Sequence, residues 1–320
     1  MGGVGIACPQ VGRRWCTPFV NVRFCTWLRY NLPVPIHSVA IMSKPRRDEL
    51  REVVPGLVKW LRHHHLEVCL DQETAFTMTS AGPTFSRSEL PKDVDLVLVL
   101  GGDGTLLAAA RALQGRDIPL LAVNLGSLGF LTAVTLEELY PSLEQVLAGK
   151  HQEDRRQMVT VELHRGGEIR ATYHALNDVV LNKAAIARIL DFEVFVDGEA
   201  VSNYKADGLI LSTPTGSTGY SLAAGGPITF PQVKALLITP ICSHTLNHRP
   251  LVIPDEAVVE IVVHSHEESV YLTADGQVGM AVQHEDRIIC RRSPQVVRLI
   301  HPAGKSYFEI LRNKLKWGQR

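Results

Sequence analysis

The sequence predicts an α/β domain with a parallel sheet, followed by a domain rich in antiparallel β-strands. The chain has 320 residues, and at about 150 residues per domain this length favours two domains. Between Val94 and Asn124, a buried strand, a glycine turn, a helix and a second buried strand follow one another, which is the order of a parallel βαβ unit. After residue 150, several segments alternate or run apolar with β-branched residues, as strands do.

The first domain is predicted over residues 37–150. Ser38–Met42 is expected to form a short buried strand, and Asp48–His65 has a helical apolar period despite Pro55. The other expected elements are a strand at Leu66–Leu70, a loop at Thr74–Pro91, a strand at Val94–Leu100, a helix at Leu106–Leu113 and a strand at Ile118–Asn124.

The second domain is predicted over residues 151–300. Asp197-Gly198 lies between two strand-like runs, which is a strong hairpin signal. The expected strands are Val159–Leu163, Ile169–His174, Asp178–Leu181, Phe192–Val196, Leu209–Leu211, Val258–His264 and Val270–Thr273. The closing segment 301–320 returns to a helical period at Ser306–Trp317.

Residues 1–36 have a different composition, with four arginines and no acidic residue. We expect a disordered leader or a start codon assigned too far upstream. The alternative is an organelle transit peptide, because such peptides are rich in Arg and poor in acids.

Composition excludes several classes of protein. The 33 basic residues balance 33 acidic ones, so we expect no binding to nucleic acid or to an anionic membrane surface. No apolar stretch approaches the length that a membrane-spanning helix needs. The six cysteines form no C-x-x-C pair, which favours reduced thiols in a cytoplasmic protein over a disulfide scaffold or a zinc ribbon.

The segment Gly101–Thr105 (GGDGT) follows a buried strand and precedes a helix. Its glycines allow a ligand to approach backbone N–H groups, and the helix N-terminus favours an anion such as phosphate. A carboxylate would repel phosphate, so Asp103 suits a general base for a substrate hydroxyl, or a magnesium partner. A glycine-rich turn capped by an Asp is the structural alternative.

Three further segments are candidate binding elements. Ser212–Ser221 contains many hydroxyl side chains, and Tyr220 in it can stack on a base. Asn177-Asp178 lies among apolar residues, and ribose hydroxyls are suitable partners for such a pair. Asn124–Phe130 leaves a strand at the sheet edge where ligands bind in α/β folds. A surface turn and a satisfied core network are the structural alternatives for the first two.

Taken together, several motifs resemble those of the NAD kinase family, whose members phosphorylate NAD to NADP. GGDGTLL, NLGSLGF, LND, SNYKADG, DGLILSTPTGSTGYSLAAGGPI, LTADGQ and SYFEILRNKLKWG occur in the family's order over about residues 37–318. GGDGT alone would be weak, because lipid kinases and phosphofructokinases carry related turns. Two positions depart from the family pattern: Asp178 stands where many relatives have Glu, and Gly219 where Ala is usual.

The resemblance implies a fold, an assembly and a reaction. The active site would lie between the two domains, the C-terminal segment would pack back on the first domain, and the protein would be a homodimer or homotetramer. The terminal phosphate of ATP, with Mg²⁺, would pass to the 2′-hydroxyl of the adenosine ribose of NAD. The resemblance implies no direct protein ligand for the metal.

The resemblance also implies a role for each matching residue. Asp103 would be the general base. The implied binding residues are Gly101, Gly102, Gly104 and Thr105 for phosphates, Phe130 for lining the dinucleotide pocket, Asn177 and Asp178 for hydrogen bonds to the dinucleotide, Lys205 and Asp207 for its nicotinamide end near a neighbouring subunit, Thr215, Thr218, Gly219 and Tyr220 for adenine, and Asp275 and Gln277 as additional contacts.

Other functions are weighed against this one. A lipid or sphingoid kinase would share the GGDGT turn but need an apolar substrate cleft. A dinucleotide sensor would keep the pocket but needs no base. A serine hydrolase would use Ser221, although Ala223 stands where its second motif glycine belongs. The sequence leaves open whether ATP or polyphosphate is the donor, whether NADH is accepted, and how the enzyme is regulated.

Overall fold

A computed structural model gives the fold of most of the chain. It describes residues 36–44, 48–76, 78, 82–126, 129–132, 134–183, 189–245, 247–264, 270–302 and 306–318. The predicted leader, apart from Ile36, lies outside these residues.

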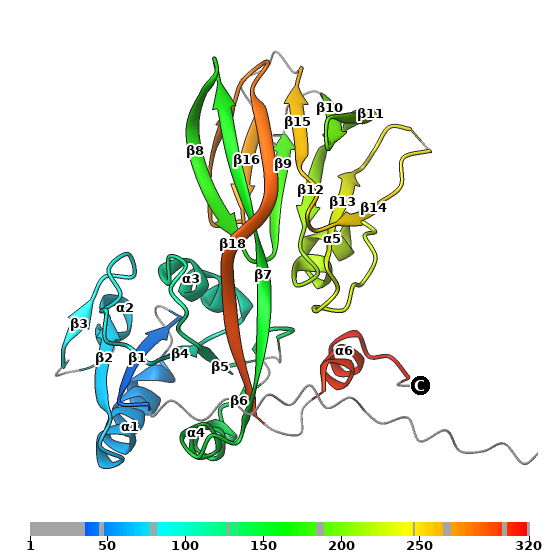
Figure 1. Ribbon diagram of the computed structural model, residues 1–320. Helices are drawn as coiled ribbons and strands as arrows, with labels where there is room; N and C mark the ends of the chain where they lie inside the picture. Colours follow the sequence, from blue (N-terminus) through cyan, green and yellow to red (C-terminus); the bar gives the residue numbers. More distant parts are fainter. Residues whose placement is uncertain are drawn as a thin grey trace, which may run out of the picture. The chain divides into compact units, whose positions relative to one another are not determined.

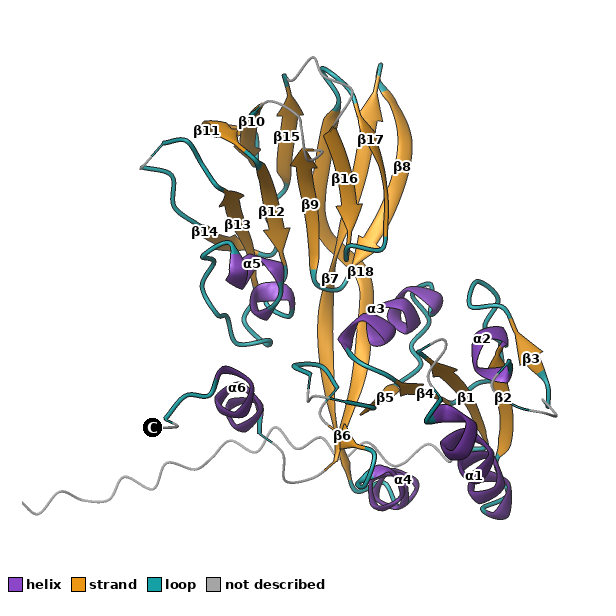
Figure 2. Cartoon of the chain, turned by 180° about the vertical axis from the view of Figure 1, so that it is seen from behind, coloured by secondary structure: helices purple, strands orange, loops and turns teal. Residues whose placement is uncertain are grey.

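A parallel sheet with helices on both faces forms the first part of the chain (Figures 1 and 2). Its strands lie in the order β3-β2-β1-β4-β5, and β18 joins parallel to β5. The elements are β1 (Ser38–Ser43), α1 (Leu50–His63), β2 (Glu67–Asp71), α2 (Gln72–Ala75), β3 (Thr84–Phe85), β4 (Leu96–Leu100), α3 (Asp103–Ala112), β5 (Leu120–Asn124), β6 (Val134–Thr135) and α4 (Leu139–Leu147).

Strand residues alternate between the two faces of this sheet, since successive side chains of a strand point in opposite directions. On β1, Val39 and Ile41 pack with residues of α1 and α4, whereas Ala40 and Met42 pack with residues of α3. Because both faces are covered, the central strands are apolar throughout, which explains why they are clear in the sequence.

Two antiparallel β-layers form the second part. One is a six-stranded sheet in the order β14-β13-β12-β9-β16-β17, and the other includes β8, β7, β18, β15, β10 and β11. The elements are β7 (His151–Arg165), β8 (Glu168–Ala175), β9 (Asp178–Lys183), β10 (Leu190–Val196), β11 (Glu199–Ala206), β12 (Gly208–Ser212), the 3-10 helix η1 (Gly216–Thr218), α5 (Tyr220–Ala223), β13 (Ala235–Ile241), β14 (Leu251–Pro254), β15 (Val259–Val263), β16 (Val270–Ala274), β17 (Val278–Val282), β18 (Arg287–Pro302) and α6 (Tyr307–Leu315). Side chains such as Phe192, Leu211 and Leu272 fill one buried cluster shared by the two layers.

Two long strands, β7 and β18, connect the parallel and antiparallel parts. They pair antiparallel from Arg287↔His164 to Pro302↔His151, and β18 also pairs with β5 at Leu299↔Leu120. The predicted fold class is confirmed. The division at residues 150 and 300 stays a prediction, because β18 pairs with β5 of the parallel part as well as with β7 and β15 of the antiparallel part.

Several elements differ from the predicted ones. β7 begins at His151 rather than at the predicted Val159. The prediction missed its first half because those residues are charged and polar rather than apolar. α3 begins at Asp103, so the glycine turn leads directly into its first turn. Residues 74–91, predicted as a loop, contain the end of α2 and the short strand β3. The helix α4 and the strands β6, β13, β14, β17 and β18 were not predicted.

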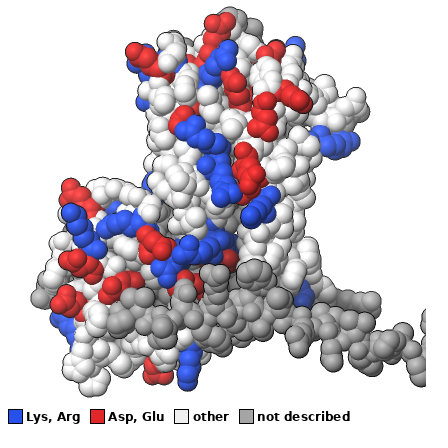
Figure 3. Space-filling view, viewed as in Figure 1, with Lys and Arg blue, Asp and Glu red and all other residues white. Residues whose placement is uncertain are grey.

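The final helix, α6, contacts residues of both parts. Lys314 Nζ lies 6.0 Å from the centre of the Phe130 ring, and the Tyr307 and Phe308 rings pack against Phe230. The aromatic residues of α6 thus pack on the second part of the chain, and the expected return of this segment to the first domain stays a prediction. No helix in the described part of the chain has the length and apolar character that crossing a bilayer requires. Acidic and basic side chains are interspersed on the face drawn in Figure 3.

Candidate active site

The GGDGT segment forms the turn between β4 and α3. The N–H of Gly101 donates to the Val123 carbonyl at 2.9 Å, which holds the turn against β5. A side chain at Gly101 would overlap Thr105, so the turn requires glycine there. The N–H of Thr105 donates to the Gly102 carbonyl at 2.9 Å, and the helix begins with Asp103 in its first turn.

The Asp103 carboxylate is held by the loop after β5. Its Oδ2 accepts from the Phe130 N–H at 3.0 Å. Its Oδ1 accepts from the Leu131 N–H at 3.1 Å and from both the N–H and the hydroxyl of Thr132, at 3.1 and 3.0 Å. A methyl group at Gly129 would overlap Oδ1. The structure thus brings together the two glycine-rich motifs that the sequence placed at one sheet edge.

The hydroxyl-rich loop lies on the segment Leu176–Asp178. Thr213 Oγ1 donates to the Leu176 carbonyl at 2.6 Å, and a side chain at Gly216 would overlap the backbone of Asn177. A methyl group at Gly219 would be in ordinary contact with Asn177 Nδ2 and Asp178 Oδ2, at 3.7 and 3.9 Å. This close approach brings the predicted adenine loop and the predicted ribose pair into one site.

A pocket of about 430 Å³ opens at this place. Its lining includes Asn177, Asp178, Tyr220 and Asp275, all of them predicted site residues. The Oδ1 atom of Asn177 is buried and has no hydrogen-bond partner among the described residues. A buried polar atom without a partner is costly, so this amide oxygen is available to a ligand that donates hydrogen bonds.

Two carboxyl groups of the pocket have raised pKa values. Burial is the larger cause at Asp178 and the nearby Asp275 charge the smaller, and together they raise the pKa of Asp178 to about 7. Burial also raises the pKa of Asp275, although three backbone N–H groups oppose the shift. These N–H groups belong to Leu176, Asn177 and Asp178, at 2.9, 2.7 and 3.2 Å from the carboxylate.

Other predicted residues do not line this pocket, among them Asp103, Lys205, Asp207, Thr215 and Thr218. Lys205 is exposed on β11 and pairs with Asp191 at 3.7 Å, whereas Asp207 pairs with Lys183 at 2.6 Å. Lys183 itself lines the pocket. Thr215 is buried, and its hydroxyl accepts a 3.4 Å hydrogen bond from Arg156. The Thr218 hydroxyl donates to the Thr215 carbonyl at 3.4 Å.

Sequence reasoning missed several pocket residues. They are Val180, Asn182, Lys183, Tyr271, Thr273 and Gly276. Asn182 and Val180 pair across the sheet with Tyr271 and Thr273. Because alternate residues of a strand share a face, the predicted strand at Asp178–Leu181 already implied that residue 180 faces the same way as Asp178. The pairing with β16 was not visible in the sequence.

The serine hydrolase alternative does not fit the geometry. Ser221 is fully buried, and its hydroxyl lies 3.1 Å from that of Thr239. A nucleophilic serine needs an exposed hydroxyl beside a base, so Ser221 has a structural role.

Comparisons with known proteins agree with this site. A family model for the ATP-NAD kinase N-terminal domain matches residues 39–151, and one for the C-terminal domain matches residues 176–302. The NAD kinases of Solibacter usitatus and Koribacter versatilis are each 49% identical to this chain, over 89% and 88% of it and 99% of their own length.

Among solved structures, yeast NADH kinase complexed with NADH has a TM-score of 0.82 at 26% identity, covering 89% of both chains. An NAD kinase from Archaeoglobus fulgidus in complex with ATP has a TM-score of 0.70 at 24% identity, covering 87% of this chain and 98% of that one, and shows the same fold. With two family domains and about half of its residues shared with full-length relatives, this chain belongs to the NAD kinase family.

Proposed function

We propose that this protein transfers the terminal phosphate of ATP to the 2′-hydroxyl of the adenosine ribose of NAD, with Asp103 as the general base. The observation that carries the proposal is the position of Asp103. Asp103 lies in the first turn of α3, and four hydrogen bonds from the loop after β5 fix its carboxylate. The carbonyl of the next residue, Gly104, accepts a hydrogen bond from Gln277, which lies two residues after the pocket residue Asp275.

The hydrogen bonds on Asp103 leave one of its carboxylate oxygens, Oδ2, able to accept a proton from the substrate. A carboxylate has about four lone-pair positions. Oδ1 accepts three hydrogen bonds, whereas Oδ2 accepts only the one from Phe130. Oδ2 therefore retains a lone pair for a substrate hydroxyl, and the four donors hold the side chain in one orientation.

The reaction then follows as a phosphoryl transfer. Asp103 Oδ2 takes the proton of the 2′-hydroxyl as its O–H bond breaks, and the freed electron pair forms a bond to the terminal phosphorus. The bond from that phosphorus to the bridging oxygen breaks, and ADP leaves. Since the transition state is loose, placement and charge neutralisation provide most of the rate enhancement.

The pocket supports a sugar-bearing acceptor over a lipid. The unpartnered Asn177 Oδ1 and the buried Asp178 carboxylate are acceptors, which suit the hydroxyl donors of ribose. Tyr220 is 43% exposed at the pocket and is free to stack on adenine. A lipid kinase would need an apolar lining here instead. Transfer of radiolabelled phosphate from ATP to NAD but not to diacylglycerol would distinguish the two functions.

Magnesium would enter with the donor rather than in a protein cage. Mg²⁺ prefers octahedral oxygen ligands, with water and phosphate among them. The hydrogen bonds on Asp103 leave one lone-pair position, on Oδ2, and the proposed base role uses that position for the substrate hydroxyl rather than for the metal. The donor phosphates would hold the ion, which neutralises their charge, and the N–H groups at the start of α3 would bind the same phosphates.

The test of the base is Asp103→Asn. We expect turnover to fall about 10²–10⁴-fold while calorimetric binding of NAD is retained, because Asn keeps the shape but cannot take the proton. Asp197→Asn is the matched control, since it makes the same change in an exposed hairpin turn. Near-normal turnover of Asp103→Asn would contradict the base role, and NAD binding without any turnover by the unmodified enzyme would favour a sensor.

We further propose a cytoplasmic homodimer or homotetramer in which Lys205 lies near a neighbouring subunit. Its exposed position on β11 supports this role. Light scattering after gel filtration measures the subunit number. NADP formation with ATP, polyphosphate or no donor, and with NAD or NADH as acceptor, defines the substrates.

A further inference from the structure

The turn between β16 and β17 bonds to two separate segments of the site. Asp275 and Gly276 have φ values of 52° and 62°, which is the backbone of a tight two-residue hairpin turn. The Asp275 carboxylate accepts the N–H groups of Leu176, Asn177 and Asp178. Two residues later, Gln277 Nε2 donates to the Gly104 carbonyl at 2.7 Å.

The segment bound by Asp275 is also fixed from the other side. The Asp275 N–H donates to the Asp178 carbonyl at 2.9 Å, so the contact is reciprocal. Leu176 is fully buried and belongs to the same apolar cluster as Leu106 and Leu107 of α3. The backbone that carries Asn177 and Asp178 is therefore held between α3 and this hairpin turn.

Gly104 directly follows Asp103 in the first turn of α3. A hydrogen bond to its carbonyl therefore fixes the start of the helix that carries the base. Among the described residues, this is the one side-chain hydrogen bond between α3 and the segment that runs from β9 to β17. One short turn thus holds both the base helix, through Gln277, and the acceptor segment, through Asp275.

We infer that Gln277 is a positioning residue that sets the placement of Asp103 against the ribose site at Asn177 and Asp178. The resemblance to NAD kinases had implied that Gln277 contacts substrate. Its amide nitrogen is instead engaged with Gly104, so it acts through the base helix. This inference rests on the proposed function, and it adds the residue that aligns the general base with the ribose hydroxyl.

The hydrogen bond between Gln277 and Gly104 is exposed to solvent. Its loss can therefore lower the rate of catalysis without lowering the stability of the fold. An exposed hydrogen bond contributes little to folding, because water replaces the lost partner. Catalysis is far more sensitive, since a displacement of about 1 Å costs up to about 10²-fold in rate. A positioning role therefore predicts a loss in kcat with little change in melting temperature.

The experiment replaces the donor without changing the length of the side chain. Gln277→Glu places a carboxylate oxygen against the Gly104 carbonyl, and Gln277→Met removes the hydrogen bond without adding charge. With NAD and ATP saturating, we expect kcat to fall about tenfold or more in Gln277→Glu and less in Gln277→Met. The KM for NAD should stay within about twofold of the original.

A pH profile provides a readout that a purely structural role would not move. Below about pH 5 the introduced Glu gains a proton and can donate again, so the activity of Gln277→Glu relative to the unmodified enzyme should rise there. Gln283→Glu makes the same change at an exposed site of the same domain and should leave kcat unchanged at every pH.

Each outcome decides the question. Unchanged kcat in both Gln277 variants would overturn the inference. A raised KM for NAD with unchanged kcat would also overturn it, because it would show that Gln277 contacts substrate. If the unmodified enzyme forms no NADP in the same assay, the proposed function fails and the inference fails with it.

Discussion

Asp178 is a buried acid whose charge depends on pH near neutrality. It is 6% exposed, and its burial together with the Asp275 carboxylate raises its pKa to about 7. Only the charged form is acceptor-only and suited to a pair of ribose hydroxyls. The Asp178 carboxyl therefore titrates near neutral pH.

Binding of NAD should depend on this titration. If only the charged form of Asp178 binds well, affinity should fall as pH drops below about 7, approaching tenfold per pH unit. Asp178→Asn should bind more weakly at pH 8 and lose this dependence. Calorimetric titration of both proteins between about pH 5.5 and about pH 8.5 checks the expectation, and a pH-independent affinity in the unmodified protein would contradict it.

The stability of the ligand-free protein should change in the opposite direction. Because the folded pKa of Asp178 is raised, its contribution to the free energy of unfolding is fully present below the unfolded pKa and is lost as pH rises through about 7. The gain in melting temperature of Asp178→Asn over the unmodified protein should therefore be larger at about pH 8 than at about pH 5. Thermal unfolding followed across this range measures the difference.

The loop after β5, through residues 130–132, forms a cradle of hydrogen-bond donors around Asp103 in the first turn of α3. Four donors from residues 130–132 converge on Asp103, and the amide of Asn124 supports the Thr132 hydroxyl at 2.8 Å. Gly129 makes room for the carboxylate, since any side chain there would meet Oδ1. The two glycine-rich motifs therefore work as one unit.

Gly129→Ala should disturb this unit. The added methyl group must push the loop or Asp103 away, so we expect kcat to fall at least about tenfold and the free energy of unfolding to fall by about 1–3 kcal/mol. Gly126→Ala in the same loop is the control, because its methyl group would meet only Asn124 Oδ1, at 3.9 Å. Steady-state kinetics and urea unfolding measure both effects. Equal kcat values for the two variants would show that the cradle does not position the base.

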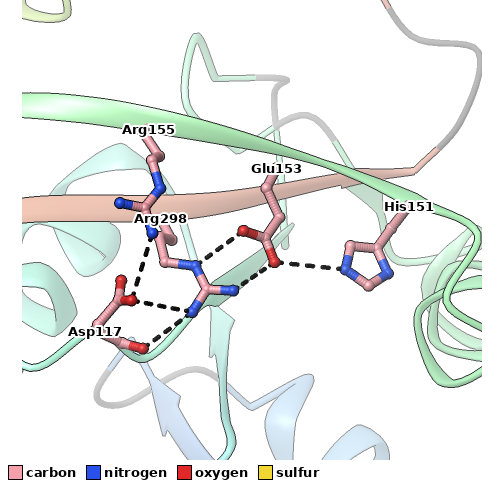
Figure 4. Close-up of polar contacts among 5 residues, drawn as sticks. All are labelled: Asp117, His151, Glu153, Arg155 and Arg298. Carbon is pink, nitrogen blue, oxygen red and sulfur yellow. Dashed lines mark hydrogen bonds and ion pairs between the residues drawn. The ribbon is translucent and has the colours of Figure 1, made fainter. Parts of the chain in front are cut away.

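The long pair β7 and β18 joins the parallel and antiparallel parts of the molecule, and an ion-pair cluster reinforces it (Figure 4). Arg298 on β18 binds Glu153 on β7 through two hydrogen bonds, of 2.9 and 2.5 Å. It also donates to the Asp117 carbonyl at 3.0 Å, next to β5. The hydrogen bond from Arg298 is the largest cause of the lowered pKa of Glu153.

Arg298→Ala should weaken the whole fold. We expect the free energy of unfolding to fall by about 2 kcal/mol, the typical range for hydrogen bonds to charged groups. Since the pKa of Glu153 is lowered, this contribution is present above its unfolded pKa and lost as pH falls through the folded value. Arg155→Ala, which breaks only an exposed 3.4 Å pair with Asp117, should change stability by less than about 1 kcal/mol. Equal losses in the two variants, measured by urea unfolding at neutral pH, would contradict this account.

The predictability of each element follows from where its side chains lie. β1, β4 and β5 were predicted because they are buried on both faces, so their central residues form continuous apolar runs. The first half of β7 was not, because its residues Glu153, Asp154 and Arg156 satisfy one another and their neighbours through charge. A charged strand looks like a loop until its partner strand is known.

The sequence by itself determined the glycine turn between a buried strand and a helix, the hydroxyl-rich loop and the Asn177-Asp178 pair, because these depend on neighbours within a few residues. Only the tertiary structure decided which distant atoms meet. The Phe130 N–H donates to Asp103, 27 residues away in the sequence, and the Gln277 side chain donates to Gly104, 173 residues away. The physical reason is that local backbone preferences act over one turn or one hairpin. Contacts between distant segments, in contrast, are set by the packing of whole sheets and helices around a shared core.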